Sequence, residues 1–189
     1  MTAEADYAPY LGPYLDDGES LRVVCEGGRV AQGRTFRSRG GRGAWRFLEP
    51  LGDVFSPTQA FDWLLFGRAA GGYYDSTAAK LIASATGKAS ESHLLAITNR
   101  RLLWCGLTGR PLGHWTYQEG GRAVPNDLVS VLFSAERSVL AGARAGRYRL
   151  RPGRLWIYFT DGSWVAFAGG GRLAACHERV TAEIGPRRM

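Results

Sequence analysis

The chain has 189 residues, a formal net charge of +7 and a hydrophobic content of 45%, with six tryptophans spread along it. This length suits one domain with a single hydrophobic core, and the composition argues against a disordered or fibrous protein. The excess of positive charge favours an acidic partner, which can be nucleic acid, an anionic membrane surface or an acidic protein.

The sequence contains no stretch approaching the roughly 20 apolar residues needed to span a bilayer, and the acidic residues 1–6 lead into no secretory signal. We therefore expect a cytoplasmic protein, which can also lie at the inner face of the membrane. The basic residues are nearly all arginine, which together with abundant Gly and Ala is typical of a GC-rich bacterial genome. The three cysteines are Cys25, Cys105 and Cys176, and they share no CxxC spacing. We therefore expect reduced, partly buried thiols and neither a metal nor another cofactor.

The first part of the chain is predicted to contain a leader, one strand, a loop and two helices. Residues 1–17 form a polar leader dotted with Tyr and Pro, and the alternating apolar residues from Leu21 to Cys25 predict the first strand. Residues 28–46 are rich in Gly, Ser and Arg and predict a mobile loop. Capping signals then predict two helices, 57–66 and 76–86, which together form a helical hairpin.

The rest of the chain predicts short strands and one final helix. Alternating apolar patterns predict a hairpin over 94–105 and further strands at 114–118, 126–133 and 148–150. A second hairpin is expected where 155–160 and 164–168 flank a turn at Asp161-Gly162-Ser163. Four residues recur at helical spacing and predict an amphipathic helix over 172–184: Leu173, Cys176, Val180 and Ile184.

The segment Leu94-Leu95-Ala96-Ile97-Thr98-Asn99-Arg100-Arg101-Leu102-Leu103 resembles a hairpin of bacterial pleckstrin-homology-like and GRAM-like domains. Gly18-Glu19-Ser20-Leu21, the segment 125–131, the Asp161-Gly162 hairpin and the final helix follow in the order of that family. The resemblance covers roughly 18–27 and 91–185, and relative to that family the segment 28–90 is expected to be a long insertion between the first two strands. It implies a single mainly β domain, α+β by content, over 1–189. Its antiparallel β-barrel would be capped by a C-terminal helix and interrupted by the inserted helical hairpin. The resemblance also implies a non-catalytic module that binds acidic lipid head groups or proteins.

A row of arginines in the C-terminal half of the chain is the densest basic patch that we expect to be ordered. Arg147, Arg149 and Arg151 alternate with apolar or aromatic residues, so on one strand their side chains share a face at a spacing of about 6 to 7 Å. Arg144 precedes the row, and Arg154 lies in the turn expected after it. The row either contacts successive anionic groups or forms a solvated strand face.

The insertion offers two further candidate contacts. Domains of the family that the sequence resembles often hold phosphates between their first two strands, where Arg34, Arg37 and Arg39 lie in this chain. The same Arg/Gly loop can instead bind nucleic acid, or it can be a plain flexible insertion. The predicted helix 57–66 is apolar almost all round because of Phe61, Trp63 and Phe66. Such a helix either inserts at a membrane surface or packs on the barrel and covers an edge strand.

No nucleophile motif surrounds a cysteine or histidine, and Gly169-Gly170-Gly171 lacks the Gly-Lys-Ser/Thr that would hold a nucleotide. We therefore expect no catalytic residues and no enzyme. The leading hypothesis is a non-catalytic binding module for an anionic membrane surface or a protein partner. The alternative is a nucleic-acid-binding protein that uses the Arg/Gly loop, and the third is an enzyme with an unrecognised site.

Overall fold

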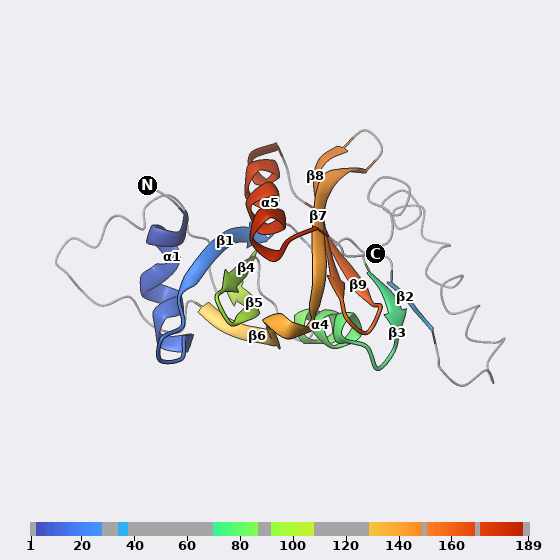
Figure 1. Ribbon diagram of the computed structural model, residues 1–189, viewed down its shortest axis with the longest axis horizontal. Helices are drawn as coiled ribbons and strands as arrows, with labels where there is room; N and C mark the ends of the chain where they lie inside the picture. The colour runs from blue at the N-terminus through green and yellow to red at the C-terminus, as the bar shows by residue number, and fades with distance from the viewer. Residues whose placement is uncertain are drawn as a thin grey trace.

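The computed structural model describes residues 3–27, 34–37, 70–86, 92–107, 129–148, 151–168 and 171–186. Two β-sheets, with helices beside them, make up most of this part of the chain (Figure 1). The first sheet has the order β1-β4-β5-β6, formed by Leu21–Gly27, Ser92–Thr98, Arg101–Leu107 and Val129–Glu136. The second has the order β2-β3-β9-β8-β7, formed by Arg34–Arg37, Ala70–Tyr73, Trp164–Ala168, Arg151–Phe159 and Leu140–Tyr148.

The strand pairing follows the predicted hairpins. β4 and β5 meet at Asn99 and Arg100, and β8 and β9 are joined across Asp161-Gly162-Ser163. All pairs are antiparallel except β2 with β3. The prediction of a mainly antiparallel β protein with a C-terminal helix is confirmed. The described strands form two separate sheets, so a closed barrel stays a prediction.

The main hydrophobic core lies between the two sheets. The first sheet contributes Leu95, Ile97 and Trp104, and the second contributes Leu155 and Phe167, all of them buried. Strand alternation explains this arrangement, because every second side chain points to the same face.

The C-terminal helix α5 (Gly171–Ile184) packs against this core, as predicted. Val180 is fully buried, and Ile184 is partly buried against the same cluster. Gly185 ends the helix with a φ of +93°, a backbone conformation that favours glycine. The short 3-10 helix η4 (Arg137–Val139) fastens the C-terminal end of α5, since Arg137 donates to the carboxylate of Glu183 at 2.7 Å.

The expected N-terminal leader is a helix, which corrects the prediction for 1–17. The helix α1 (Ala3–Leu11) and a 3-10 turn, η1 (Gly12–Tyr14), lie beside β1 at the far end from the second sheet (Figure 1). Tyr7 and Leu11 are buried against Leu94 and Leu103 of the first sheet. The sequence did not reveal this helix because its described packing residues, Tyr7, Tyr10 and Leu11, span little more than one turn and Pro9 lies inside it.

The described part of the insertion extends the second sheet. The predicted helix 76–86 is confirmed as α4 (Thr77–Thr86), whose first turn is capped by Ser76 and by the carboxylate of Asp161. Residues 34–37 form β2, so the predicted mobile loop is wrong over these four residues. The rest of that loop and the predicted helix 57–66 lie outside the described residues, as does the predicted strand 114–118.

A disulfide joins β1 to α5. Cys25 and Cys176 are bonded across 151 residues of sequence, with their Cα atoms 5.9 Å apart, so the prediction of reduced thiols is wrong for this pair. Cys105 is free and buried. Cysteine spacing could not indicate the pair, because the fold brings together two distant elements. Disulfides are typical of oxidising compartments, so the bond is at odds with the cytoplasmic expectation, which stays untested. No helix within the described ranges is long and apolar enough to cross a membrane.

Candidate functional site

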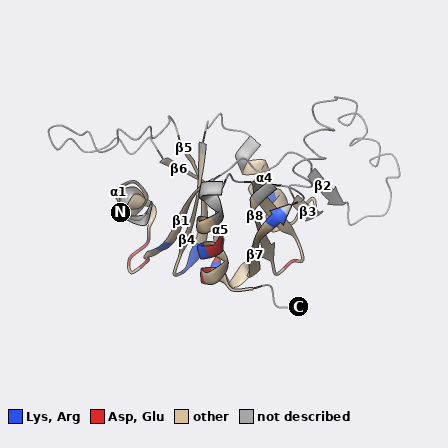
Figure 2. Ribbon diagram, turned by 90° about the horizontal axis from the view of Figure 1, so that it is seen from above, with Lys and Arg blue, Asp and Glu red and all other residues tan. Residues whose placement is uncertain are grey.

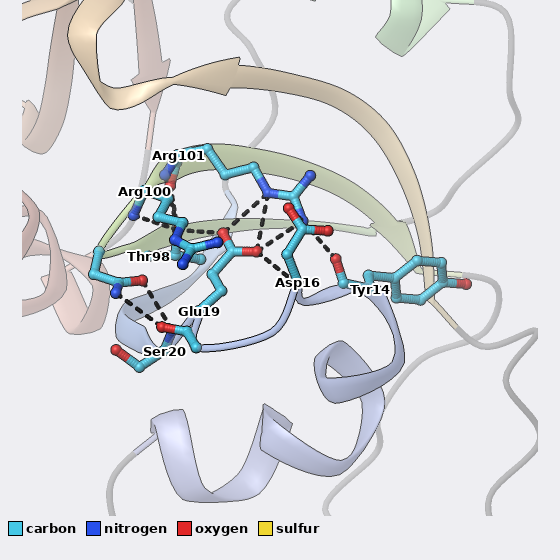
Figure 3. A network of polar contacts seen from close by, with 9 residues as sticks. Tyr14, Asp16, Glu19, Ser20, Thr98, Arg100 and Arg101 are labelled. Atoms are coloured by element: carbon cyan, nitrogen blue, oxygen red, sulfur yellow. Dashed lines mark hydrogen bonds and ion pairs between the residues drawn. The ribbon is translucent and has the colours of Figure 1, made fainter.

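A polar network joins the N-terminal segment to the β4–β5 hairpin (Figure 3). At its centre the Glu19 side chain is fully buried and accepts two-pronged hydrogen bonds from the Arg101 guanidinium, the shortest at 2.7 Å. Thr98 Oγ1 donates to the same carboxylate at 2.6 Å. Burial alone would raise the pKa of Glu19, but these hydrogen bonds and the one from the Asp16 backbone lower it from 4.5 to about 2.

Asn99 completes this network. Its side-chain oxygen accepts from the Ser20 amide at 2.9 Å, and its side-chain nitrogen donates to the Gly18 carbonyl at 3.2 Å. The two motifs that carry the family resemblance, Gly18-Glu19-Ser20-Leu21 and Thr98-Asn99-Arg100-Arg101, therefore contact each other directly. Their polar side chains are therefore engaged in contacts within the fold.

The predicted arginine row does not lie on one strand. β7 ends at Tyr148, β8 begins at Arg151, and these two residues stand opposite each other in a hairpin. Arg149 lies outside the described residues, and of this row only Arg147 has a described side chain, which is exposed. The prediction failed because basic and apolar residues alternate without interruption from Arg147 to Arg151, and the nearest turn signal, Pro152-Gly153, lies within β8.

Arg154 lies within β8 and is only 4% exposed, so its predicted place in a turn is wrong. Its guanidinium lies 5.1 Å from the centre of the Trp156 ring. Arg144 stands opposite Trp156 on β7, is exposed, and approaches the same ring at 5.4 Å. The structure thus brings two of the predicted arginines together on one indole, an arrangement stabilised by cation–π attraction.

The predicted contacts of the insertion are mostly untested. Arg34 and Arg37 lie at the two ends of β2. Arg39, Phe61, Trp63 and Phe66 lie outside the described residues.

A shallow groove of about 690 Å³ runs between α5 and the edge of β7. Small residues dominate it, with one charged residue on each side, and its lining comprises Ala143, Arg144, Ala145, Tyr158, Glu178, Thr181, Ala182 and Pro186. Figure 2 shows basic residues on the sheet that contains β7 and β8, and acidic residues on α5. This groove could not be predicted from the sequence, because an alanine in a strand or helix gives no indication that it lines a binding surface.

The edge of β7 that faces this groove already accepts main-chain pairing. β7 is the last strand of its sheet, and the Ala143 amide donates to the Gly185 carbonyl at 2.9 Å. Ala143 also forms a parallel bridge with Pro186. Because amides alternate along a strand, the Ala145 amide points to the same side. Within the described strands, none pairs with β7 there.

Two buried titratable groups are poorly suited to catalysis at neutral pH. His177 on α5 is 2% exposed; its burial lowers the pKa to about 4, although a hydrogen bond with the Gly153 backbone acts in the opposite direction. Burial also raises the pKa of the Cys105 thiol to about 12. The histidine is thus neutral and the thiol protonated, and neither can reach solvent. In the described part of the chain, no three His, Cys, Asp or Glu residues gather closely enough to hold a metal ion.

Comparisons with known proteins gave no matching family model, no similar curated protein and no similar solved structure. The interpretation of the site therefore depends on its geometry.

Proposed function

We propose that this chain is a non-catalytic binding module that takes an extended segment of a protein partner as an added strand along the edge of β7. The observation that carries this proposal is the Ala143–Gly185 hydrogen bond, in which the chain's own tail already pairs with that edge. An unpaired strand edge supplies main-chain hydrogen bonds for affinity, and a neighbouring groove supplies side-chain specificity.

The walls of the groove define the segment that it can take. Ala143, Ala145 and Ala182 leave room for side chains of the incoming strand, and Thr181 lies among them on the α5 side. Arg144 and Glu178 can pair with one charge of each sign at the rims. An extended segment with small or apolar side chains flanked by charged ones fits these features.

The family resemblance supports a binding module in general. A pleckstrin-homology-like barrel and an anionic membrane surface remain proposals that depend on strand closure and on residues of the insertion. The protein partner is favoured because the edge of β7 offers main-chain hydrogen bonds beside the groove, and an extended peptide can use both.

Displayed random peptides selected on the folded protein would test the proposal. The selected peptides should bind in fluorescence polarisation, and N-methylation of alternate peptide amides should abolish binding because it removes the ladder donors. Ala182→Trp should fill the groove and weaken binding at least about tenfold.

Ala83→Trp provides the matched control, because Ala83 is an exposed alanine on α4, a helix that contributes no residue to the lining of the groove. It should leave affinity unchanged. A selection that yields no binding peptide, or peptides equally affected by both variants, would contradict strand addition at β7.

A further inference from the structure

The outer face of the second sheet carries aromatic and basic side chains set among small residues. Leu155, Ile157 and Phe167 point into the core, so the alternate residues of β8 and β9 point to the opposite face. Three rows cross this face from strand to strand: Gly142-Tyr158-Trp164-Gly71, Arg144-Trp156-Ala166 and Gly146-Arg154-Ala168. None of these described positions is acidic.

The glycines allow the indole rings to lie against the sheet. A Cβ atom at Gly71 would fall 2.4 Å from Trp164 Nε1, so the Trp164 ring occupies the space above β3. Trp156 likewise reaches over Gly146, where a Cβ atom would lie 3.5 Å from the ring. Both tryptophans and Tyr158 remain partly exposed. Rings held in this way present an aromatic surface on which a planar group can stack.

Cationic groups accompany these rings. Arg144 and Arg154 flank Trp156 at 5.4 and 5.1 Å from the ring centre. Of these two cations Arg144 is exposed and Arg154 is buried. A ligand suited to this face therefore alternates planar groups with negative charges. Single-stranded nucleic acid has this chemistry, because its bases stack on aromatic side chains while its phosphates contact arginines.

We propose that the outer face of the second sheet binds single-stranded nucleic acid, with Trp156 and Trp164 as stacking platforms and Arg144 as a phosphate contact. This surface is separate from the strand edge proposed for a protein partner, although Arg144 borders both. Rings lying against the backbone suit stacking better than insertion between lipids, which requires side chains that project from the surface. A duplex hides its bases and offers this face only its phosphates.

Fluorescence anisotropy with labelled single strands of about 12 nucleotides, oligo-dT and oligo-U, would test the proposal between about 50 and 200 mM salt. The wild type should bind single strands more tightly than a duplex of the same length. Trp156→Ala should weaken binding about tenfold, the loss typical of one stacked base. Arg144→Gln should lower the slope of log affinity against log salt by about 0.7, the contribution of one phosphate contact on a single strand.

Arg22→Gln is the matched control, because Arg22 is an exposed arginine on β1 of the other sheet. Circular dichroism would show whether Trp156→Ala folds, and Arg144→Gln tests the same face without removing a packed ring. Ala182→Trp should leave nucleic-acid binding intact while it blocks the peptide, so the two proposals can fail independently.

Absence of binding at about 50 mM salt would overturn the proposal, as would variants of this face that behave like Arg22→Gln. A preference for duplex would also overturn it. Binding to phosphatidylglycerol vesicles in place of the oligonucleotides would assign the face to a membrane instead.

Discussion

Replacing Glu19 with Gln should remove much of the stability that the N-terminal segment gives to the first sheet. The Glu19 side chain is fully buried and its pKa is lowered to about 2, from an ordinary value of 4.5. A shift of this size corresponds to about 3 kcal/mol of folding free energy at neutral pH. Gln keeps the shape of the side chain but removes its charge, and it leaves Arg101 with the more distant Asp16 carboxylate at 3.4 Å. We expect a loss of about 2 to 3 kcal/mol.

The pH dependence gives a second measure of the same contact. Because the folded pKa of Glu19 lies below the unfolded value, its contribution is complete above about pH 4.5 and is lost as the pH falls towards 2. Urea denaturation of the wild type at a series of pH values should show this loss, and the Glu19→Gln variant should lack that part of it. The matched control Glu178→Gln, at an exposed glutamate, should show the same pH dependence of stability as the wild type.

The reasoning would be refuted if Glu19→Gln lay within about 0.5 kcal/mol of the wild type at pH 7, the range of ordinary surface substitutions. An unchanged acid limb of the stability curve would refute it as well.

Three further predictions concern the packing of helix α5 and one close contact within the second sheet. Val180→Asp should lower stability by more than about 3 kcal/mol in thermal or urea unfolding, because it buries a carboxylate in an apolar core, and a small loss would speak against the packing of α5. Reduction of the Cys25–Cys176 bond by a dithiol should lower the free energy of unfolding by about 2 to 4 kcal/mol, and the stability of a variant with both cysteines replaced by Ser should not respond to the reductant. Gly71→Ala should cost about 1 to 3 kcal/mol and shift tryptophan fluorescence, because Trp164 must move; an unchanged spectrum would count against the close approach.

The parts of the fold that the sequence predicted are those specified by neighbouring residues. The hairpin at Asn99 and Arg100 follows from its turn residues and from the alternation on either side. Helix α4 follows from a cap at Ser76, and α5 from apolar residues at helical spacing with Gly185 as its stop.

The parts that could not be predicted depend on contacts between distant segments. Cys25 and Cys176 meet only after β1 and α5 have been placed. The sequence alternates from Arg147 to Arg151 as on a single strand, so these two arginines were assigned to one strand when the register places them on two. The groove is lined by alanines whose role depends on the tail at Pro186.

Hydrogen–deuterium exchange at β7, with and without a selected peptide, tests the proposed strand addition most directly. An added strand should slow exchange at the Ala145 amide, which faces the groove, and leave the Gly146 amide nearly unchanged, because β8 already covers that side. Peptide binding that leaves the Ala145 amide as exchangeable as in the free protein would contradict it.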